Sequence, residues 1–195
     1  MDNTEVKIVE AAIACIEKHG LDKATIRLIA EEAGMNSAAI SYYFRGKDKL
    51  LEIAQQTALE NGFEWKDYAY TDALNAKDQL AAVLFQLTEG AQKYPNLIKA
   101  FFMDAFLKGD YSGSGIKKLN NFLNLLCEKL LVKCPSITEK QLRQLIHQAF
   151  CGAVLPCVTM PNAFESLLQF DFTDSNKRKA YTENLVDKLF AEVDV

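Results

Sequence analysis

Apolar residues recur at steps of three and four positions along most of the chain, which is the spacing of one helix face. The first such segment stops at Gly20, where a left-handed helix cap would sit. Its apolar positions are Val6, Val9, Ile13 and Ile16. No segment of useful length alternates apolar and polar residues as a half-buried strand does. The pattern therefore predicts an all-α fold.

Two short amphipathic segments follow the first helix and are joined by a glycine. Thr25 is a candidate N-cap for residues 26–33, and Gly34 ends that segment after two turns. Ser37 is a candidate N-cap for residues 38–44. Two short helices joined by a three- or four-residue turn that contains Gly form a helix-turn-helix. We therefore expect a small three-helix unit at the N-terminus.

Longer helices are expected in the rest of the chain. Breaks are expected at Pro95, in the glycine-rich residues 109–115, in residues 134–138 and after residue 160. The predicted helices run from Lys47 toward Trp65 and over about 75–93, 95–108, 116–133, 138–160 and 175–193. Behind the small unit we therefore expect a larger helical bundle.

Charge and cysteine content narrow the class of protein. The 195 residues carry a net charge of -4, which argues against indiscriminate coating of nucleic acid, so any DNA contact must be local. The five cysteines include no C-x-x-C pair, as is usual in a reducing cytoplasm. Acidic residues near the N-terminus argue against a targeting peptide. The uncharged run 144–164 contains glutamine, histidine and proline, so we expect a buried helix there and no contact with a membrane.

The outward side of the predicted third helix is small and mildly polar. Ala38 and Ala39 can touch thymine methyl groups in a DNA groove. Ser37 and Ser41 can donate or accept hydrogen bonds, and Tyr42 offers a ring edge and a hydroxyl. This side of the helix is suited to close approach to base edges.

Three further side chains are candidates for DNA contacts. Arg27 has the planar fork that fits a guanine edge or a phosphate. Tyr43 and Lys47 are better placed as phosphate clamps, since Lys47 starts a helix whose free amides also favour anions. The alternative interpretation of Tyr42 and Tyr43 is partial packing beneath Phe44.

Residues 9–51, VEAAIACIEKHGLDKATIRLIAEEAGMNSAAISYYFRGKDKLL, resemble the N-terminal domain of the TetR-type transcriptional regulators. The resemblance implies that Thr25 and Arg27 lie near DNA, that base-facing residues lie between Asn36 and Tyr42, and that Tyr43 and Lys47 hold phosphates. Gly46 departs from the Ser or Asn that is frequent in the family. The resemblance ends near residue 55. It implies a DNA-binding domain over residues 1–48 and a ligand-binding and dimerisation domain over residues 49–195.

Aromatic residues gather in residues 63–70 and 101–106. A ligand pocket needs such residues, and so does any hydrophobic core, so both interpretations stay open. Met103 would make an adaptable pocket wall. The candidate ligand-binding residues are Trp65, Phe102, Met103, Phe106, Phe122, His147 and Cys151.

Apolar stripes on the last two long predicted helices are candidates for a dimer seam. Two such helices from each subunit would form a four-helix arrangement. Pro156, if it lies within the first of them, should kink or end that helix. The candidate dimerisation residues are Ile146, Phe150 and Val154, with Val158 continuing the stripe, and Tyr181, Leu185 and Leu189 on the last helix.

The sequence gives little support for a metal site, a catalytic site or a disulfide. His147 and Cys151 can share a helix face, but two ligands without a third predict neither a metal site nor catalysis. Cys151 and Cys157 are too far apart along a helix for a disulfide. We expect no cofactor and no enzyme activity. The resemblance implies a cytoplasmic, ligand-responsive repressor that binds a palindromic operator as a homodimer. An activator, or a helical small-molecule binding or adaptor protein without DNA affinity, is the alternative.

Overall fold

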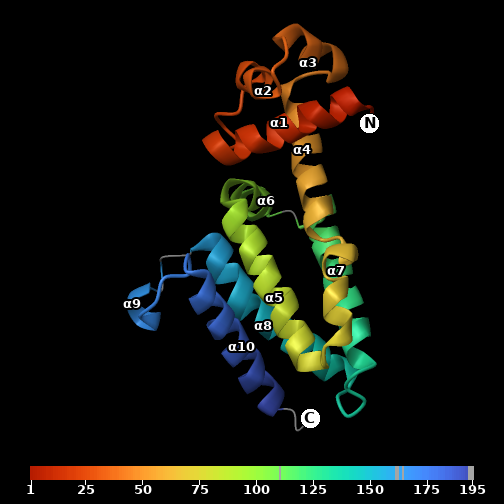
Figure 1. Ribbon diagram of the computed structural model, residues 1–195, viewed down its shortest axis with the longest axis vertical. Coiled ribbons are helices and arrows are strands. Elements are labelled where there is room, and N and C mark those ends of the chain that lie inside the picture. Colours follow the sequence, from red (N-terminus) through yellow and green to blue (C-terminus); the bar gives the residue numbers. More distant parts are fainter. Residues whose placement is uncertain (110, 161–162, 164, 193–195) are drawn as a thin grey trace. The chain divides into compact units, whose positions relative to one another are not determined.

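The computed structural model describes residues 1–109, 111–160, 163 and 165–192, apart from the side chains of residues 103–106, 108, 114, 158 and 159. Over these ranges the chain is helical and contains no β-strand, as the apolar periodicity predicts (Figure 1). The elements are α1 (Asn3–His19), α2 (Ile26–Ala33), α3 (Ser37–Tyr43), α4 (Lys47–Gly62), η1 (Trp65–Asp67), η2 (Ala69–Ala73), α5 (Ala76–Lys93), α6 (Pro95–Lys108), α7 (Ser114–Leu131), α8 (Glu139–Thr159), α9 (Glu165–Leu168) and α10 (Ser175–Ala191).

The sequence pattern located the long helices and missed three short ones. The fourth helix ends at Gly62 and not near Trp65, because two 3-10 helices follow it, and α9 was not expected. Pro156 lies inside α8, which continues to Thr159. No helix in the described ranges combines the length and the apolar character that crossing a bilayer requires.

The chain divides into two compact units. Unit 1 contains residues 1–62 and 94–118, and unit 2 contains residues 63–93 and 119–195. Unit 1 therefore includes α6 and the first residues of α7, while the larger part of α7 belongs to unit 2.

Side-chain caps fix the starts of the helices in unit 1. Asp2 caps α1 and forms a capping box with Glu5, and Thr25 accepts the N–H of Leu28 at the start of α2. Asn36, not Ser37, caps α3, because its side chain accepts the N–H of Ala38. The expected cap is therefore one residue too late in the sequence.

The core of unit 1 is formed where α1 packs against α2, α4 and α6. Ala30 and Ala33 on α2 are buried, and their small size allows close helix contact. Gly34 adopts a left-handed conformation with φ 62°, which reverses the chain between α2 and α3 without the strain a larger residue would incur. The fully buried side chains include Ile8, Ala12, Ile16, Ile29, Ile40 and Leu50.

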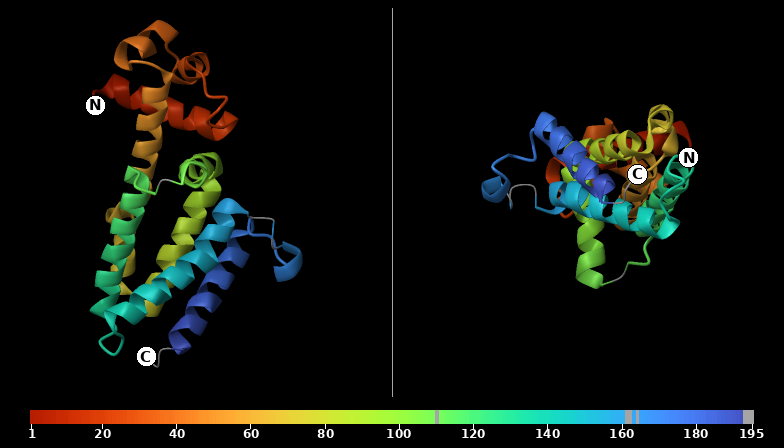
Figure 2. Two further views of the ribbon diagram at one scale, coloured as in Figure 1. Left: turned by 180° about the vertical axis from the view of Figure 1, so that it is seen from behind. Right: turned by 90° about the horizontal axis from the view of Figure 1, so that it is seen from below.

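In unit 2, α5 packs against α8 and α10, and these two helices also pack against each other (Figure 2). Their shared core is aliphatic and aromatic. It includes Leu80, Leu84, Leu142, Ala149, Val186 and Phe190.

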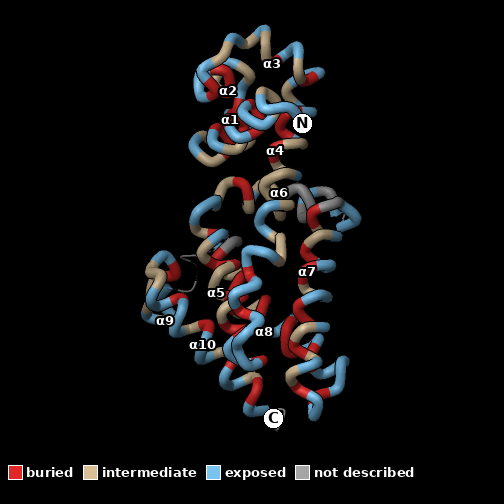
Figure 3. Tube along the Cα trace, turned by 45° about the vertical axis from the view of Figure 1, so that its right-hand side comes forward, coloured by how far each residue is buried: buried red, intermediate tan, exposed pale blue. Residues whose placement is uncertain are grey.

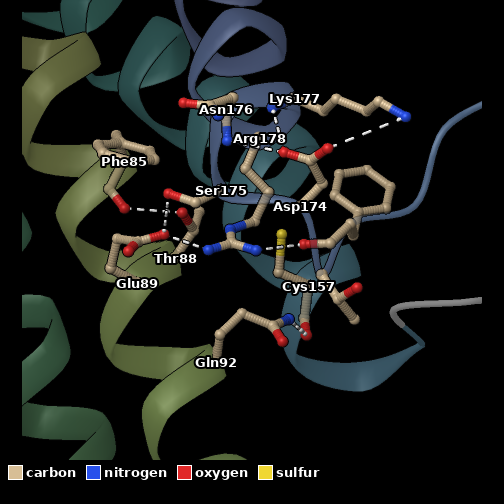
Figure 4. A network of polar contacts seen from close by, with 12 residues as sticks. Phe85, Thr88, Glu89, Gln92, Cys157, Asp174, Ser175, Asn176, Lys177 and Arg178 are labelled. Carbon is tan, nitrogen blue, oxygen red and sulfur yellow. Dashed lines mark hydrogen bonds and ion pairs between the residues drawn. The ribbon is translucent and has the colours of Figure 1, made fainter.

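A buried arginine joins α10 to α5 (Figure 4). Arg178 is 3% exposed and forms an ion pair with Glu89 on α5. Its guanidinium also donates to the carbonyl oxygen of Phe172, and the hydroxyl of Ser175 donates to the same Glu89 carboxylate at 3.0 Å. A buried charge requires such a partner, so the pair fixes how the start of α10 lies on α5.

Candidate nucleic-acid interface

In the third helix only Ile40 is buried, and the other residues are exposed or half-buried (Figure 3). Ile40 and the adjoining Phe44 are buried and anchor the helix to the core of unit 1. Ala38, Ser41 and Tyr42 are exposed, and Tyr42 keeps 85% of its surface accessible. The outward face is therefore small in its first turn and carries one large aromatic side chain near its end.

The two tyrosines lie in different environments. Tyr43 is half-buried and packs against the core of unit 1. The rings of Tyr42 and Tyr43 are in edge contact, with centroids 5.5 Å apart and an interplanar angle of 88°. Tyr43 thus supports the ring of Tyr42. Partial packing applies to Tyr43, which lies against the core cluster that contains Phe44, and not to the exposed Tyr42.

Several polar side chains of the predicted site already make local hydrogen bonds. Asn36 accepts the N–H of Ala38 at 2.9 Å, so its oxygen serves the helix cap while its amide N–H groups stay available. The hydroxyl of Ser41 donates to the carbonyl oxygen of Ser37 at 3.1 Å. It can therefore still accept a hydrogen bond from a base edge. The hydroxyl oxygen of Thr25 accepts the N–H of Leu28 at 3.2 Å.

Basic side chains near the third helix make no ion pairs with residues in the described ranges. Arg27 and Arg45 are exposed, and Lys47 is half-buried at the first position of α4. Arg45 was not among the predicted residues. Its signal in the sequence is a basic residue directly after Phe44, at the end of the third helix.

Some acidic side chains of unit 1 have local partners, whereas Glu31 and Asp48 are exposed. Asp2 and Glu5 cap α1, Glu17 binds the start of α6, and Glu32 pairs with Lys18 at 3.8 Å. The unpaired positive groups beside the third helix can attract phosphates.

The candidate ligand-binding residues fall in both units. Phe102 lies in unit 1 with its ring against Phe101, at a centroid distance of 4.8 Å. Trp65 and Phe122 lie in unit 2 with centroids 5.7 Å apart. The side chains of Met103 and Phe106 lie outside the described residues.

Trp65 and Phe122 take part in a packed aromatic cluster formed by Phe63, Trp65, Tyr68 and Phe122. Phe122 is 3% exposed, and its centroid lies 4.9 Å from that of Tyr68. The indole N–H of Trp65 donates to Asp72 at 3.3 Å, and the ammonium group of Lys129 lies 4.7 Å from the indole centroid. Burial raises the pKa of the Tyr68 hydroxyl, and the charge of Asp67 raises it further. The rings of this cluster thus pack against one another, with Tyr68 and Phe122 buried.

His147 and Cys151 lie on one face of α8. His147 is exposed, Cys151 is half-buried, and the cysteine Sγ lies 3.5 Å from the histidine Nε2. Burial raises the pKa of the Cys151 thiol.

The candidate dimerisation residues differ in how much surface they present. Ile146, Phe150 and Val154 are 3%, 7% and 5% exposed, so they pack within the core of their own chain. Tyr181, Leu185 and Leu189 are half-buried. The side chain of Val158 lies outside the described residues.

An exposed recognition helix, a sharp glycine turn and unpaired basic groups beside them define a helix-turn-helix DNA-binding protein. The family model for bacterial regulatory proteins of the tetR family matches residues 8–54. The HTH-type transcriptional regulator BetI of Vibrio atlanticus is 41% identical over 160 residues, which cover 78% of this chain and 77% of that protein. The chain therefore belongs to the TetR family of bacterial regulatory proteins.

Other relatives match over a shorter part of the sequence, and the solved structures are similar in fold alone. Two further curated BetI regulators match over 26% and 25% of their own length, so the chain spans about a quarter of those relatives. A transcriptional regulator from Rhodococcus sp. RHA1 is 16% identical with a TM-score of 0.67, and the match covers 98% of both chains. FadR of Bacillus subtilis in complex with stearoyl-CoA is 20% identical with a TM-score of 0.60, over 93% of this chain and 97% of that chain.

Proposed function

We propose that this protein is a ligand-responsive transcriptional repressor that acts in the cytoplasm and binds a palindromic operator as a homodimer. Residues 1–48 would read DNA, and residues 49–195 would bind the effector and the second subunit. The observation that carries the proposal is the exposed face of the third helix, together with basic side chains on the elements that precede and follow it. These are Arg27 on α2, Arg45 after α3 and Lys47 at the start of α4.

The third helix would enter the major groove of one half-site. Ala38, Ala39 and Tyr42 would contact base edges and thymine methyl groups, and Ser37 and Ser41 would exchange hydrogen bonds with bases. The positioning contacts to phosphates would come from residues at the rim of this face. These are Thr25, Arg27, Asn36, Tyr43 and Lys47, to which the exposed position of Arg45 adds one more.

A small molecule bound in residues 49–195 would regulate the affinity for DNA. FadR of Bacillus subtilis forms a complex with stearoyl-CoA, and this chain has the same fold. The effector would release DNA only if it binds more tightly to the conformation with the weaker DNA affinity. Reciprocity then requires DNA to weaken effector binding by the same factor.

The decisive experiment selects binding sites from random duplex DNA with the purified protein at near-physiological salt. The enriched sequence is then titrated by fluorescence anisotropy. We expect a palindrome that binds two chains or a multiple of two. A protein that enriches no sequence even at low salt would instead be a helical binding or adaptor protein, and the repressor proposal would be wrong.

A further inference from the structure

The outward face of α8 carries a pair of metal-ligating side chains that the DNA-binding surface does not use. Along this helix the residues that face the core are Leu142, Leu145, Ala149 and Ala153, which are all buried. Gln144, His147 and Gln148 are exposed on the other side, and Cys151 continues that side as a half-buried residue. The imidazole and the thiol are therefore accessible from outside the bundle.

The spacing of the two side chains fits a shared metal ion. Tetrahedral Zn²⁺ binds cysteine sulfur at about 2.3 Å and histidine nitrogen at about 2.0 Å, which places the two ligand atoms about 3.5 Å apart. The observed separation of Cys151 Sγ from His147 Nε2 is 3.5 Å. Residues four apart on a helix thus hold both donor atoms at the chelating distance without a change of backbone.

One chain supplies only half of such a site. No group of three or more His, Cys, Asp or Glu side chains gathers within the described residues of this chain. Structural zinc sites hold four ligands in a closed tetrahedron. A two-fold axis beside α8 would bring a second His147 and a second Cys151 to the first pair and so complete the set.

We propose that two copies of this chain bind one Zn²⁺, or a cation of similar ligand preference, between their α8 helices through His147 and Cys151 of each copy. This inference rests on the homodimer of the proposed function. Each thiol loses its proton to solvent when the cation binds, and two thiolates balance the charge of a divalent ion. The metal would thereby link the two subunits and stabilise the dimer by an amount that rises with the logarithm of the free metal concentration above its Kd.

Cobalt substitution tests the proposal with a spectroscopic signature. Purified protein, freed of metal with a chelator under reducing conditions, is titrated with Co²⁺ and its absorption is recorded. We expect saturation at one Co²⁺ per two chains, intense visible bands of tetrahedral cobalt and a sulfur-to-cobalt charge-transfer band. Addition of Zn²⁺ should abolish these bands, because Zn²⁺ binds the same ligands more tightly.

Matched variants assign the ligands. Cys151→Ser should remove the charge-transfer band, and His147→Gln should weaken Co²⁺ binding at least tenfold. The control is His19→Gln, which changes the second histidine of the chain, in unit 1. This variant should leave the Co²⁺ titration unchanged. Circular dichroism checks that each variant is folded. Octahedral cobalt, one ion per chain, or bands that persist in folded Cys151→Ser protein would each overturn the proposal.

Light scattering and the operator titration separate this inference from the proposed function. If the protein is a DNA-binding dimer that takes up no Co²⁺, the metal site is wrong and the repressor proposal stands. If the protein is monomeric with and without metal, both the site and the proposed dimer are wrong.

Discussion

Glu17, near the end of α1, binds the first turn of α6 through Asn96. The carboxylate of Glu17 accepts the backbone N–H of Asn96 at 3.2 Å and that of Leu97 at 3.3 Å. The side-chain amide of Asn96 donates to the carbonyl oxygen of Glu17 at 2.7 Å. A carboxylate at a helix N-terminus satisfies free amides and is favoured by the helix dipole. This contact fixes α6 to α1 within unit 1.

Removal of this cap should destabilise unit 1. We expect Glu17→Ala to lower the free energy of unfolding by about 1–2 kcal/mol, because two amides of α6 lose a charged acceptor. Glu17→Gln keeps an acceptor and should cost less. Urea unfolding at a fixed chain concentration measures both variants. Glu10→Ala, on the exposed side of the same helix, is the control, and an equal effect of Glu10→Ala would show that the cap contributes nothing.

The phosphate contacts should appear as a uniform loss of DNA affinity. We expect Lys47→Ala and Arg45→Ala each to weaken binding by about 1 kcal/mol on all duplexes and to reduce the salt slope by about 1. Anisotropy titrations over a salt series give both quantities. Lys49→Ala is the matched control, because Lys49 pairs with Glu52 at 2.9 Å on the same helix. Unchanged affinity of a folded Lys47→Ala, Tyr43→Ala double variant would remove both residues from the interface.

Changes on the outward face should alter sequence preference instead. Tyr42→Ala removes an exposed ring that makes edge contact with Tyr43, so the core of unit 1 should keep its stability. We expect the ranking of operator variants to change because the contact with base edges or thymine methyl groups is lost. Site selection with the variant measures the ranking. A uniform weakening without a change of ranking would assign Tyr42 to the phosphate contacts.

Substitution by alanine should change the stability of the protein differently at two helical glycines. An added Cβ at Gly90 on α5 meets no atom within 4 Å, whereas at Gly152 on α8 it would lie 2.8 Å from Cδ2 of Leu185. Gly90→Ala should therefore stabilise the protein by about 0.5–1 kcal/mol through helix propensity. The change in the free energy of unfolding caused by Gly152→Ala should be about 1 kcal/mol less favourable than that of Gly90→Ala, because Leu185 must move.

Leu185→Ala provides the control for this comparison, since it removes the side chain that obstructs Gly152. In a Leu185→Ala background, Gly152→Ala should stabilise as Gly90→Ala does, measured as a double-mutant cycle by urea unfolding. Equal stabilisation by both glycine changes in the original background would contradict the close packing. The same contact means that Leu185→Glu would disturb α8 and α10 within one chain as well as any dimer.

Asp72 should contribute stability that acid removes. Burial raises its pKa, but hydrogen bonds from Lys129, Trp65 and Gln79 outweigh that effect, so the pKa lies below its ordinary value. A depressed pKa in the folded state gives stability that is complete above the unfolded value of about 3.9 and is lost as the pH falls through the folded value. Between about pH 5 and pH 3, the original protein should therefore lose more stability than Asp72→Asn.

Urea midpoints at the two pH values measure this difference. Asp22→Asn, at an exposed aspartate of unit 1, serves as the comparison and should follow the original protein. If Asp72→Asn loses stability as steeply as the original protein, the hydrogen bonds from Lys129, Trp65 and Gln79 do not favour the ionised carboxylate.

The sequence by itself determined the helices and the family. Apolar periodicity, the cap at Thr25 and the left-handed Gly34 depend on residues within a few positions of one another, so they can be recognised without a structure. The motif that contains Tyr43 and Lys47 is equally local. For the same reason the sequence placed the long helices well and missed α9, which has four residues and no periodicity.

Tertiary structure decided which surfaces these helices expose. Ile146, Phe150 and Val154 form an apolar stripe that fits a dimer seam or a core, and only contact with α5 and α10 shows that they are buried in their own chain. Glu17 is an ordinary helical acid in the sequence, and its partner on α6 lies 79 residues away. Such contacts join distant segments, and the apolar pattern of one helix does not specify which element will cover it.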